Sequence, residues 1–272
     1  MTAGVRGRTW WSLAAIVLAW AAVAATGRVP PQVLPGPVEF LRAALDLAGA
    51  GTLAPALAVS LTRLVAGVGV VVLLGLATGV VAGLSRLGHD LVDRPVQALR
   101  AVPFTALAPL LLVWFGLGET PKVLLVVVAC AVPVHVATVA GVQGTDPRLR
   151  EVAAVHGLRR WATVRRVVLP GALPSVLAGV RLGLGSGWVA VIVAEQVATD
   201  RGVGALLADA RLWARTDVVM LCVALYAALG LATDALVRGA EHHLLRWRRP
   251  VAPVRTPTPP TTRPTTPPTE TP

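Results

Sequence analysis

The stretch that decides the fold is Asp146–Pro174, DPRLREVAAVHGLRRWATVRRVVLPGALP, a highly charged segment between two long apolar runs. Pro147 can begin a helix, and Gly157 can end one because glycine adopts positive φ without strain. Between them the less polar residues recur at helical spacing. This spacing predicts a short amphipathic helix whose less polar face carries Leu149, Val152, Ala153 and His156.

The rest of the chain is unusually apolar. Of its 272 residues, 55% are hydrophobic and 14% are charged, and the mean hydropathy is +0.69. An ordinary soluble domain has about a quarter of its residues charged. The composition therefore excludes a water-soluble globule and indicates one polytopic membrane domain.

Six apolar stretches have lengths that suit a lipid bilayer, so the expected fold is an all-α polytopic membrane protein with six transmembrane helices. Pro103 and Pro109 interrupt the third stretch, whose helix we expect at Thr105–Phe115. The first of the six stretches could alternatively be a signal peptide, since Ala22-Val-Ala24 resembles a cleavage site. The six stretches are Thr9–Gly27, Leu64–Leu84, Ala101–Gly118, Val123–Gly141, Leu173–Val197 and Val218–Val237.

The segments between these stretches are too polar to cross a membrane. We expect a short surface helix at Val38–Leu47 in the first, a loop or surface helix at Ser85–Arg100, and a surface helix within Ala198–Asp217. The expected domain plan is a cytoplasmic N-terminus (1–8), a six-span domain (9–249) containing a charged loop (146–170), and a cytoplasmic tail (250–272). In that tail 17 of 23 residues are Pro or Thr, a composition that predicts disorder.

The net charge of +11 reports orientation rather than a nucleic-acid partner, because no basic stripe with interleaved aromatic residues accompanies it. With the N-terminus inside, 17 basic residues fall in cytoplasmic segments and six in external ones. This asymmetry predicts that both termini are cytoplasmic.

No cofactor, metal or ATPase site is expected. Cys130 and Cys222 lie inside apolar runs without metal or redox spacing, so we interpret them as small buried hydrophobic residues. A phosphate-binding loop is missing, since the only lysine, Lys122, follows Pro121 rather than Gly. We therefore expect a protein that is not an enzyme and takes its energy from another polypeptide.

The charged loop resembles the signature of the permease subunits of bacterial ATP-binding-cassette (ABC) importers. That signature is Glu-Ala-Ala, three residues, Gly, nine residues, an aliphatic residue, one more residue, and Leu-Pro. Glu151-Val-Ala, Gly157, Val167 and Leu169-Pro170 match every spacing, and Val152 departs from the family's Ala.

Other segments resemble the nitrate, sulfonate, taurine and bicarbonate branch of these permeases. They are Arg100–Leu110, Trp114–Glu119, Gly179–Gly183 and Ala194-Glu195. The resemblance covers roughly 60–249.

The resemblance implies the type I importer architecture in a bacterial inner membrane. Two permease copies would work with a cytoplasmic ATPase dimer and an external solute-binding protein, by alternating access. The helix Pro147–His156 would be the coupling helix, with Glu151 contacting the ATPase and Gly157 setting the turn. The residues implied in coupling are Glu151, Val152, Ala153, Gly157, Leu169 and Pro170.

Charged residues at membrane depth are costly and are functional candidates. Arg181, Trp188 and Glu195 are spaced by seven, so they share one helix face that could line the path or an interface. Arg181 could attract an anion or anchor its helix, and Glu195 could be a structural contact or a gate. His135 could tune the substrate or be a satisfied core histidine.

Two sets of glycines recur every four residues and predict close helix packing. They are Gly75, Gly79 and Gly83, and Gly179, Gly183 and Gly187. Asp234 is interpreted as a boundary or packing contact.

The expected cargo is a small anion such as a sulfonate, taurine, nitrate or bicarbonate. A nitrogenous vitamin or pyrimidine precursor is the alternative within the same class. ATP-independent secondary transporters and channels form a different class, as do membrane anchors. The former would predict acidic residues near the midplane and internal repeats, and neither is clear here.

Overall fold

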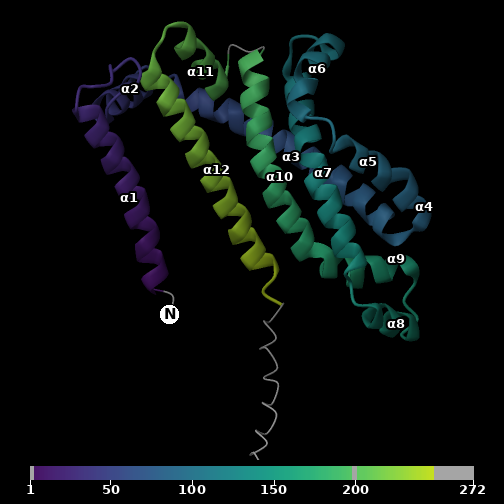
Figure 1. Cartoon of the computed structure of the whole chain (residues 1–272). Helices are drawn as coiled ribbons and strands as arrows, with labels where there is room; N and C mark the ends of the chain where they lie inside the picture. Colours follow the sequence, from purple (N-terminus) through teal and green to yellow (C-terminus); the bar gives the residue numbers. More distant parts are fainter. Residues whose placement is uncertain (1–2, 198–200, 248–272) are drawn as a thin grey trace, which may run out of the picture.

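The computed structural model describes residues 3–197 and 201–247, and every regular element within these ranges is a helix (Figure 1). This confirms the all-α prediction. The Pro/Thr-rich segment 250–272 lies outside the described residues.

A helix occupies each of the six positions predicted to span the membrane. Four helical stretches are long and apolar enough to cross alone: α3 (Leu53–Leu84), α7 (Glu119–Gln143), α12 (Thr216–Leu244), and α10 (Leu169–Val197) with the helical residues before it. The third position is a bent pair, Arg86–Leu99 and Phe104–Phe115, with 78° between its halves. The first is α1 (Ala3–Ala25), whose apolar part Ala14–Ala25 is shorter.

The shorter helices lie where polar segments were predicted. They are α2 (Pro37–Gly49), the consecutive segments α4 (Arg86–Gly88), η1 (His89–Asp93) and α5 (Arg94–Leu99), and α11 (Val203–Leu212). In the third span a 3-10 turn, η2 (Phe104–Ala106), precedes α6 (Leu107–Phe115), close to the predicted Thr105–Phe115.

Two boundaries differ from the sequence analysis in ways that bear on the site. The second span begins at Leu53 instead of Leu64, because Arg63, which interrupts the apolar pattern, is buried and paired inside the fold. The charged loop was predicted to extend to Pro170, but helix resumes at Arg160 as α9 (Arg160–Thr163) and η3 (Val164–Val168) and continues into α10. The η3 segment is a π-helix, which accommodates the backbone donor missing at Pro170.

The core of the domain is formed by α3, α7 and α10, and the predicted glycine faces are its contact lines. On α3, Gly75, Gly79 and Gly83 lie against the side chains of Val134, Thr138 and Val142 of α7. Each of these glycines meets the residue 59 positions later, so α3 and α7 run parallel.

The glycines of α10 pack on the same helix from another side. Gly179 lies against Ala137, and Gly183 and Gly187 lie against Cys130. Residue numbers rise along α10 as they fall along α7, so these two helices are antiparallel. The prediction that both glycine sets serve helix packing is confirmed.

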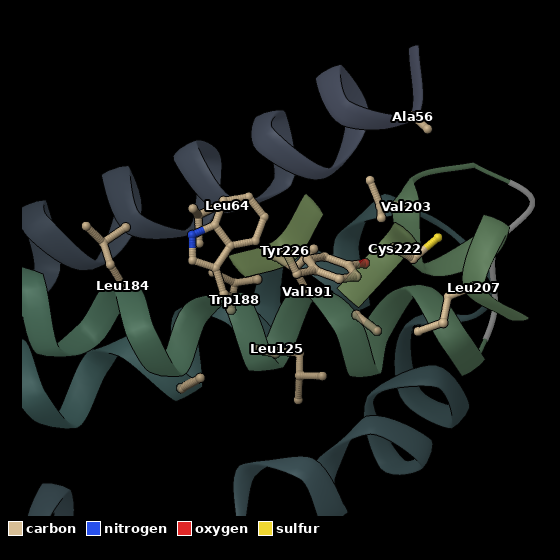
Figure 2. Close-up of a cluster of buried hydrophobic side chains, with 14 of the residues drawn as sticks. Ala56, Leu64, Leu125, Leu184, Trp188, Val191, Val203, Leu207, Cys222 and Tyr226 are labelled. Carbon is tan, nitrogen blue, oxygen red and sulfur yellow. The ribbon is translucent and has the colours of Figure 1, made fainter. Parts of the chain in front are cut away.

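Apolar side chains fill the space among α3, α7, α10, α11 and α12 (Figure 2). Leu64, Leu125 and Val191 are at most 1% exposed. The two cysteines are buried as predicted, and the Cys130 thiol donates to the carbonyl of Gly183 at 3.1 Å.

Candidate functional site

The predicted amphipathic helix is present as α8 (Pro147–Val155), one residue shorter than expected. The Asp146 carboxylate accepts from the backbone N–H of Arg148 at 2.9 Å and caps the N-terminus. At the other end Gly157 has φ +72°, and its N–H donates to the carbonyl of Ala154. The sequence thus sets both ends of α8 with local signals.

The predicted coupling residues divide between two faces of α8. Ala153 is 5% exposed and packs against the protein, whereas Glu151 and Val152 face outward. Val152, which replaces the family's Ala, is 53% exposed, so its extra methyl groups displace nothing inside the chain.

A hollow of about 430 Å³ separates α8 from the start of α10. Val152, Ala153 and Pro170 line it together with Trp247 from the far end of the chain. Glu151, Gly157 and Leu169 do not line the hollow. The structure therefore brings three of the six predicted coupling residues to one surface.

A residue that the sequence analysis did not single out ties α8 to the membrane helices. The guanidinium of Arg150 donates to the carbonyl of Val142 in the last turn of α7. Arginine suits this place because the last carbonyls of a helix lack intrahelical donors. The bond links the position of α8 to that of α7.

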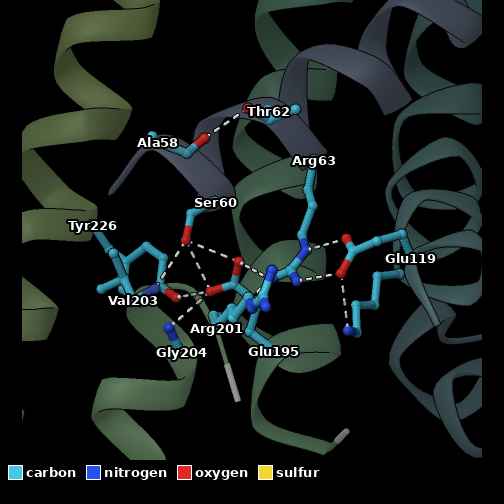
Figure 3. Close-up of polar contacts among 11 residues, drawn as sticks. Ala58, Ser60, Thr62, Arg63, Glu119, Glu195, Arg201, Val203, Gly204 and Tyr226 are labelled. Atoms are coloured by element: carbon cyan, nitrogen blue, oxygen red, sulfur yellow. Dashed lines mark hydrogen bonds and ion pairs between the residues drawn. The ribbon is translucent and has the colours of Figure 1, made fainter. Parts of the chain in front are cut away.

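The strongest polar cluster of the described chain lies at the opposite end of the bundle (Figure 3). Glu195 on α10 is fully buried, and Arg63 on α3 is 2% exposed. One guanidinium nitrogen of Arg63 donates to Glu195 Oε1 at 2.7 Å, and two others donate to the carboxylate of Glu119 at 2.7 and 2.6 Å. Arg63 thereby bridges the ends of α10 and α7.

Three further donors satisfy the Glu195 carboxylate. The Ser60 hydroxyl lies 2.8 Å from Oε1, the backbone N–H of Gly204 donates to Oε2 at 2.8 Å, and the Tyr226 hydroxyl donates to Oε2 at 3.2 Å. The Ser60 oxygen also accepts from the backbone N–H of Val203 at 3.0 Å. Glu195 thus joins α3, α10, α11 and α12, which is the geometry of a structural contact.

Of this cluster the sequence analysis named only Glu195 as a site residue, and it missed Arg63, Glu119, Ser60, Gly204 and Tyr226. Arg63 could have been identified from the sequence, because it is a charged residue at the start of an apolar run, three residues after Ser60. Neither its partner nor its depth was visible, because Glu195 lies 132 residues away.

Arg181, Trp188 and Glu195 share a face, as predicted, and that face packs on α12. Arg181 Nε lies 2.9 Å from an Asp234 oxygen, and a second nitrogen lies 3.8 Å from Glu241. Trp188 donates to the Thr233 hydroxyl at 3.0 Å and stacks edge-on against Tyr226. All three side chains therefore contact one helix of the same chain.

His135 lies apart from this face, between α7, α3 and η1. It is 1% exposed, with one ring nitrogen 3.2 Å from Asp93 Oδ1 and the other 3.1 Å from the Thr78 hydroxyl. Both ring nitrogens of His135 therefore have polar partners within the chain. Among the described residues no group of three His, Cys, Asp or Glu side chains could hold a metal ion.

The fold is that of a polytopic membrane protein. Its long apolar helices pack through lines of glycine, and a capped charged helix projects from the loop between two of them. A family model described as "Binding-protein-dependent transport system inner membrane component" matches residues 71–246. The chain belongs to this family, whose members are transport components rather than enzymes. The resemblance stated from the charged loop is confirmed.

Two curated relatives are similar over most of their length. The putative aliphatic sulfonates transport permease protein SsuC of Bacillus subtilis is 37% identical, over 86% of this chain and 85% of the relative. The taurine transport system permease protein TauC of Escherichia coli is 35% identical, over 87% and 88%. The two names refer to transport of aliphatic sulfonates and of taurine, respectively.

The fold is also found among solved structures. Inward-facing MetNI methionine ABC transporter has a chain that superposes with a TM-score of 0.55 at 21% identity, over 66% of this chain and 92% of that chain. At this identity the match supports the fold, and it agrees with the predicted ABC importer permease architecture.

Proposed function

We propose that this chain is the permease of an ATP-driven importer for small sulfonates, with α8 as the helix that receives the motion of the ATPase. The observation that carries the proposal is the exposed face of α8, where Glu151 and Val152 stand on a helix capped at both ends within the matched motif. The names of the two relatives support the sulfonate class.

The proposed orientation places α8 and both termini in the cytoplasm. Figure 1 shows the start of α1, the end of α12 and α8 at the same end of the bundle. The sequence places 17 basic residues in the segments expected to be cytoplasmic and six in those expected to be external, which supports this orientation. In this plan 1–8 and 250–272 are cytoplasmic and 9–249 is the permease domain.

Two copies of the chain, an ATPase dimer and an external solute-binding protein would form the working importer. ATP binding would draw the ATPase subunits together and move both α8 helices, and the bundles would rock between inward- and outward-facing states. The bond from Arg150 to the end of α7 gives this motion a direct route into the membrane helices. The Glu195 cluster would hold the ends of α3, α7, α10, α11 and α12 on the external side as one body.

Substrate choice would rest mainly with the solute-binding protein. Arg181, the intramembrane cation that could attract an anion, is paired with Asp234 and Glu241. A cation already compensated by two carboxylates is a weak attractor for a further anion. This pairing favours anchoring for Arg181.

The test is reconstitution of the chain in liposomes with the ATPase and binding protein of its own transport system. We expect ATP-dependent uptake of taurine or an alkanesulfonate, and none with a non-hydrolysable ATP analogue. Uptake that proceeds unchanged without ATP would overturn the importer assignment.

Variants of α8 test the coupling role. We expect Glu151→Gln and Gly157→Ala to lower ATP-driven uptake about tenfold or more, since the latter forces a Cβ into a left-handed conformation that disfavours it. Glu39→Gln on α2 and Gly69→Ala on α3 are matched controls at exposed positions and should leave uptake unchanged. Equal effects of the α8 variants and their controls would contradict the proposed role of α8.

A further inference from the structure

The helical segment between α8 and α10 carries a surface that the proposed function does not use. Its four guanidinium groups, those of Arg159, Arg160, Arg165 and Arg166, are all exposed. Within residues 3–197 and 201–247, none of the four has an ion-pair or hydrogen-bond partner, whereas the guanidinium groups of Arg63, Arg94 and Arg181 are paired with carboxylates. We call this segment, 159–166, the basic surface.

Trp161 stands in the middle of the basic surface and is 73% exposed. It precedes Arg165 by four residues, so its indole and the guanidinium lie on one side of the helix. Trp247, three residues after the end of α12 and 57% exposed, borders the same hollow as Arg166. Tryptophan is enriched where a membrane protein meets the lipid headgroups, and arginine is enriched in the loops on the cytoplasmic side.

The depth of this segment follows from the packing of the long helices. Gly83 near the end of α3 contacts Val142 near the end of α7, and Gly141 contacts Ala172 near the start of α10. These contacts mark one common level where the apolar parts of all three helices end. Arg166 lies six residues before Ala172, so at most about 9 Å along a helix separate it from that level. This distance is close to the roughly 5–8 Å thickness of one headgroup layer.

The arrangement of α8 and α9 separates two possible partners of the basic surface. Figure 1 shows α9 lying across the lower end of the bundle and α8 further from the membrane helices. A soluble ATPase approaching from the cytoplasm meets α8 first. Lipid headgroups, in contrast, surround the level at which the basic surface lies.

We propose that the basic surface binds the phosphate groups of anionic phospholipids in the leaflet that faces α8. Guanidinium groups form charge-assisted hydrogen bonds to phosphate, and unpaired arginines at the membrane surface are attracted to anionic lipid. Naming that leaflet cytoplasmic rests on the proposed function, but the lipid site itself does not.

The test measures lipid preference on the full chain in phosphatidylcholine vesicles. Electron paramagnetic resonance of spin-labelled phosphatidylglycerol and spin-labelled phosphatidylcholine gives the relative association of the two lipids with the protein. We expect a preference for phosphatidylglycerol that weakens as salt is added. The double variant Arg160→Gln with Arg165→Gln should lower it about fivefold for each arginine removed.

A matched variant removes the same charge from the other end of the molecule. Arg28 and Arg42 are exposed on the opposite side of the bundle, and Arg28→Gln with Arg42→Gln should keep the preference. An equal fall in both double variants, or no fall in either, would overturn the proposal.

Co-sedimentation of the ATPase with the same vesicles distinguishes the rival partner. A loss of ATPase binding in Arg160→Gln with Arg165→Gln at unchanged lipid preference would overturn the lipid site and assign the surface to the ATPase. If the reconstituted system shows no ATP-driven uptake while the lipid preference still depends on the two arginines, the proposed function fails and the lipid site stands.

Discussion

Arg63 and Glu195 are 132 residues apart in the sequence, yet a guanidinium nitrogen of Arg63 lies 2.7 Å from Glu195 Oε1 with both side chains buried. A buried ion pair stabilises a fold only when its remaining donors and acceptors are also satisfied. Here Glu119 takes the other guanidinium edge, and Ser60, Gly204 and Tyr226 complete the Glu195 carboxylate. The cluster therefore joins five helices, α3, α7, α10, α11 and α12, through satisfied polar contacts.

Removing the buried carboxylate should be severe. We predict that Glu195→Ala lowers the free energy of unfolding by about 3 kcal/mol or more, because it leaves Arg63 with an uncompensated edge and Gly204 with an unpaired donor. Thermal unfolding of the purified chain in detergent would measure the loss.

Glu119→Ala serves as the comparison for this prediction. Its side chain is 62% exposed, so water can replace it, and we expect a loss of about 1 kcal/mol or less. Equal losses in the two variants would show that burial does not govern the energetics of the cluster.

The Ser60 hydroxyl should stabilise the fold mainly by accepting from a buried backbone N–H. Ser60→Ala leaves the buried N–H of Val203 without its acceptor and removes one donor to Glu195. We expect a loss of about 1–3 kcal/mol. Thr62→Ala, two residues along the same helix, removes an exposed hydroxyl that bonds only its own helix and should cost less than about 0.5 kcal/mol.

The features predicted correctly from the sequence are those written in local patterns. Apolar length and helical spacing locate the spans, Pro147 and Gly157 bound α8, and the four-residue glycine repeats identify the packing faces of α3 and α10. Each of these depends on residues within a few turns of one another, so no tertiary information is needed.

The features that the sequence did not predict depend on partners far along the chain. Arg63 looked like the end of a span because its pairing with Glu119 and Glu195 arises only after folding. The helical continuation through η3 was missed because proline at 170 suggests a break, whereas the π-helix before it accommodates the proline. The face shared by Arg181, Trp188 and Glu195 was found, but its partner α12 was not.

Two glycines two residues apart on α3 should respond in opposite ways to the same substitution. A Cβ at Gly67 would lie 2.5 Å from a methyl carbon of Val126, whereas a Cβ at Gly69 would meet nothing within 4 Å. We predict that Gly67→Ala costs about 1–3 kcal/mol through overpacking. Gly69→Ala should be neutral or stabilise by up to about 1 kcal/mol through helix propensity. Similar unfolding temperatures for both variants would contradict the close contact between α3 and α7.

Arg181 and Asp234 provide a test between anchoring and substrate attraction. Both side chains are partly exposed, 41% and 34%, so their pairing should contribute only about 0.2–1 kcal/mol to stability. If Arg181 anchors α10 to α12, Arg181→Gln and Asp234→Asn should each cost little, and the double variant should cost less than the sum of the two. Thermal unfolding of the three variants would give this coupling energy.

Uptake by the reconstituted importer provides the second half of the comparison. Anchoring predicts that KM for the sulfonate stays within about twofold in all three variants, because no cation is lost from a binding site. If Arg181 attracts the substrate, KM for the sulfonate should rise in Arg181→Gln, because the anion loses its cationic partner. Adding Asp234→Asn in the double variant should not restore KM, because removing the carboxylate does not replace the lost cation. Since Arg181 already faces Asp234 and Glu241, we expect the first pattern.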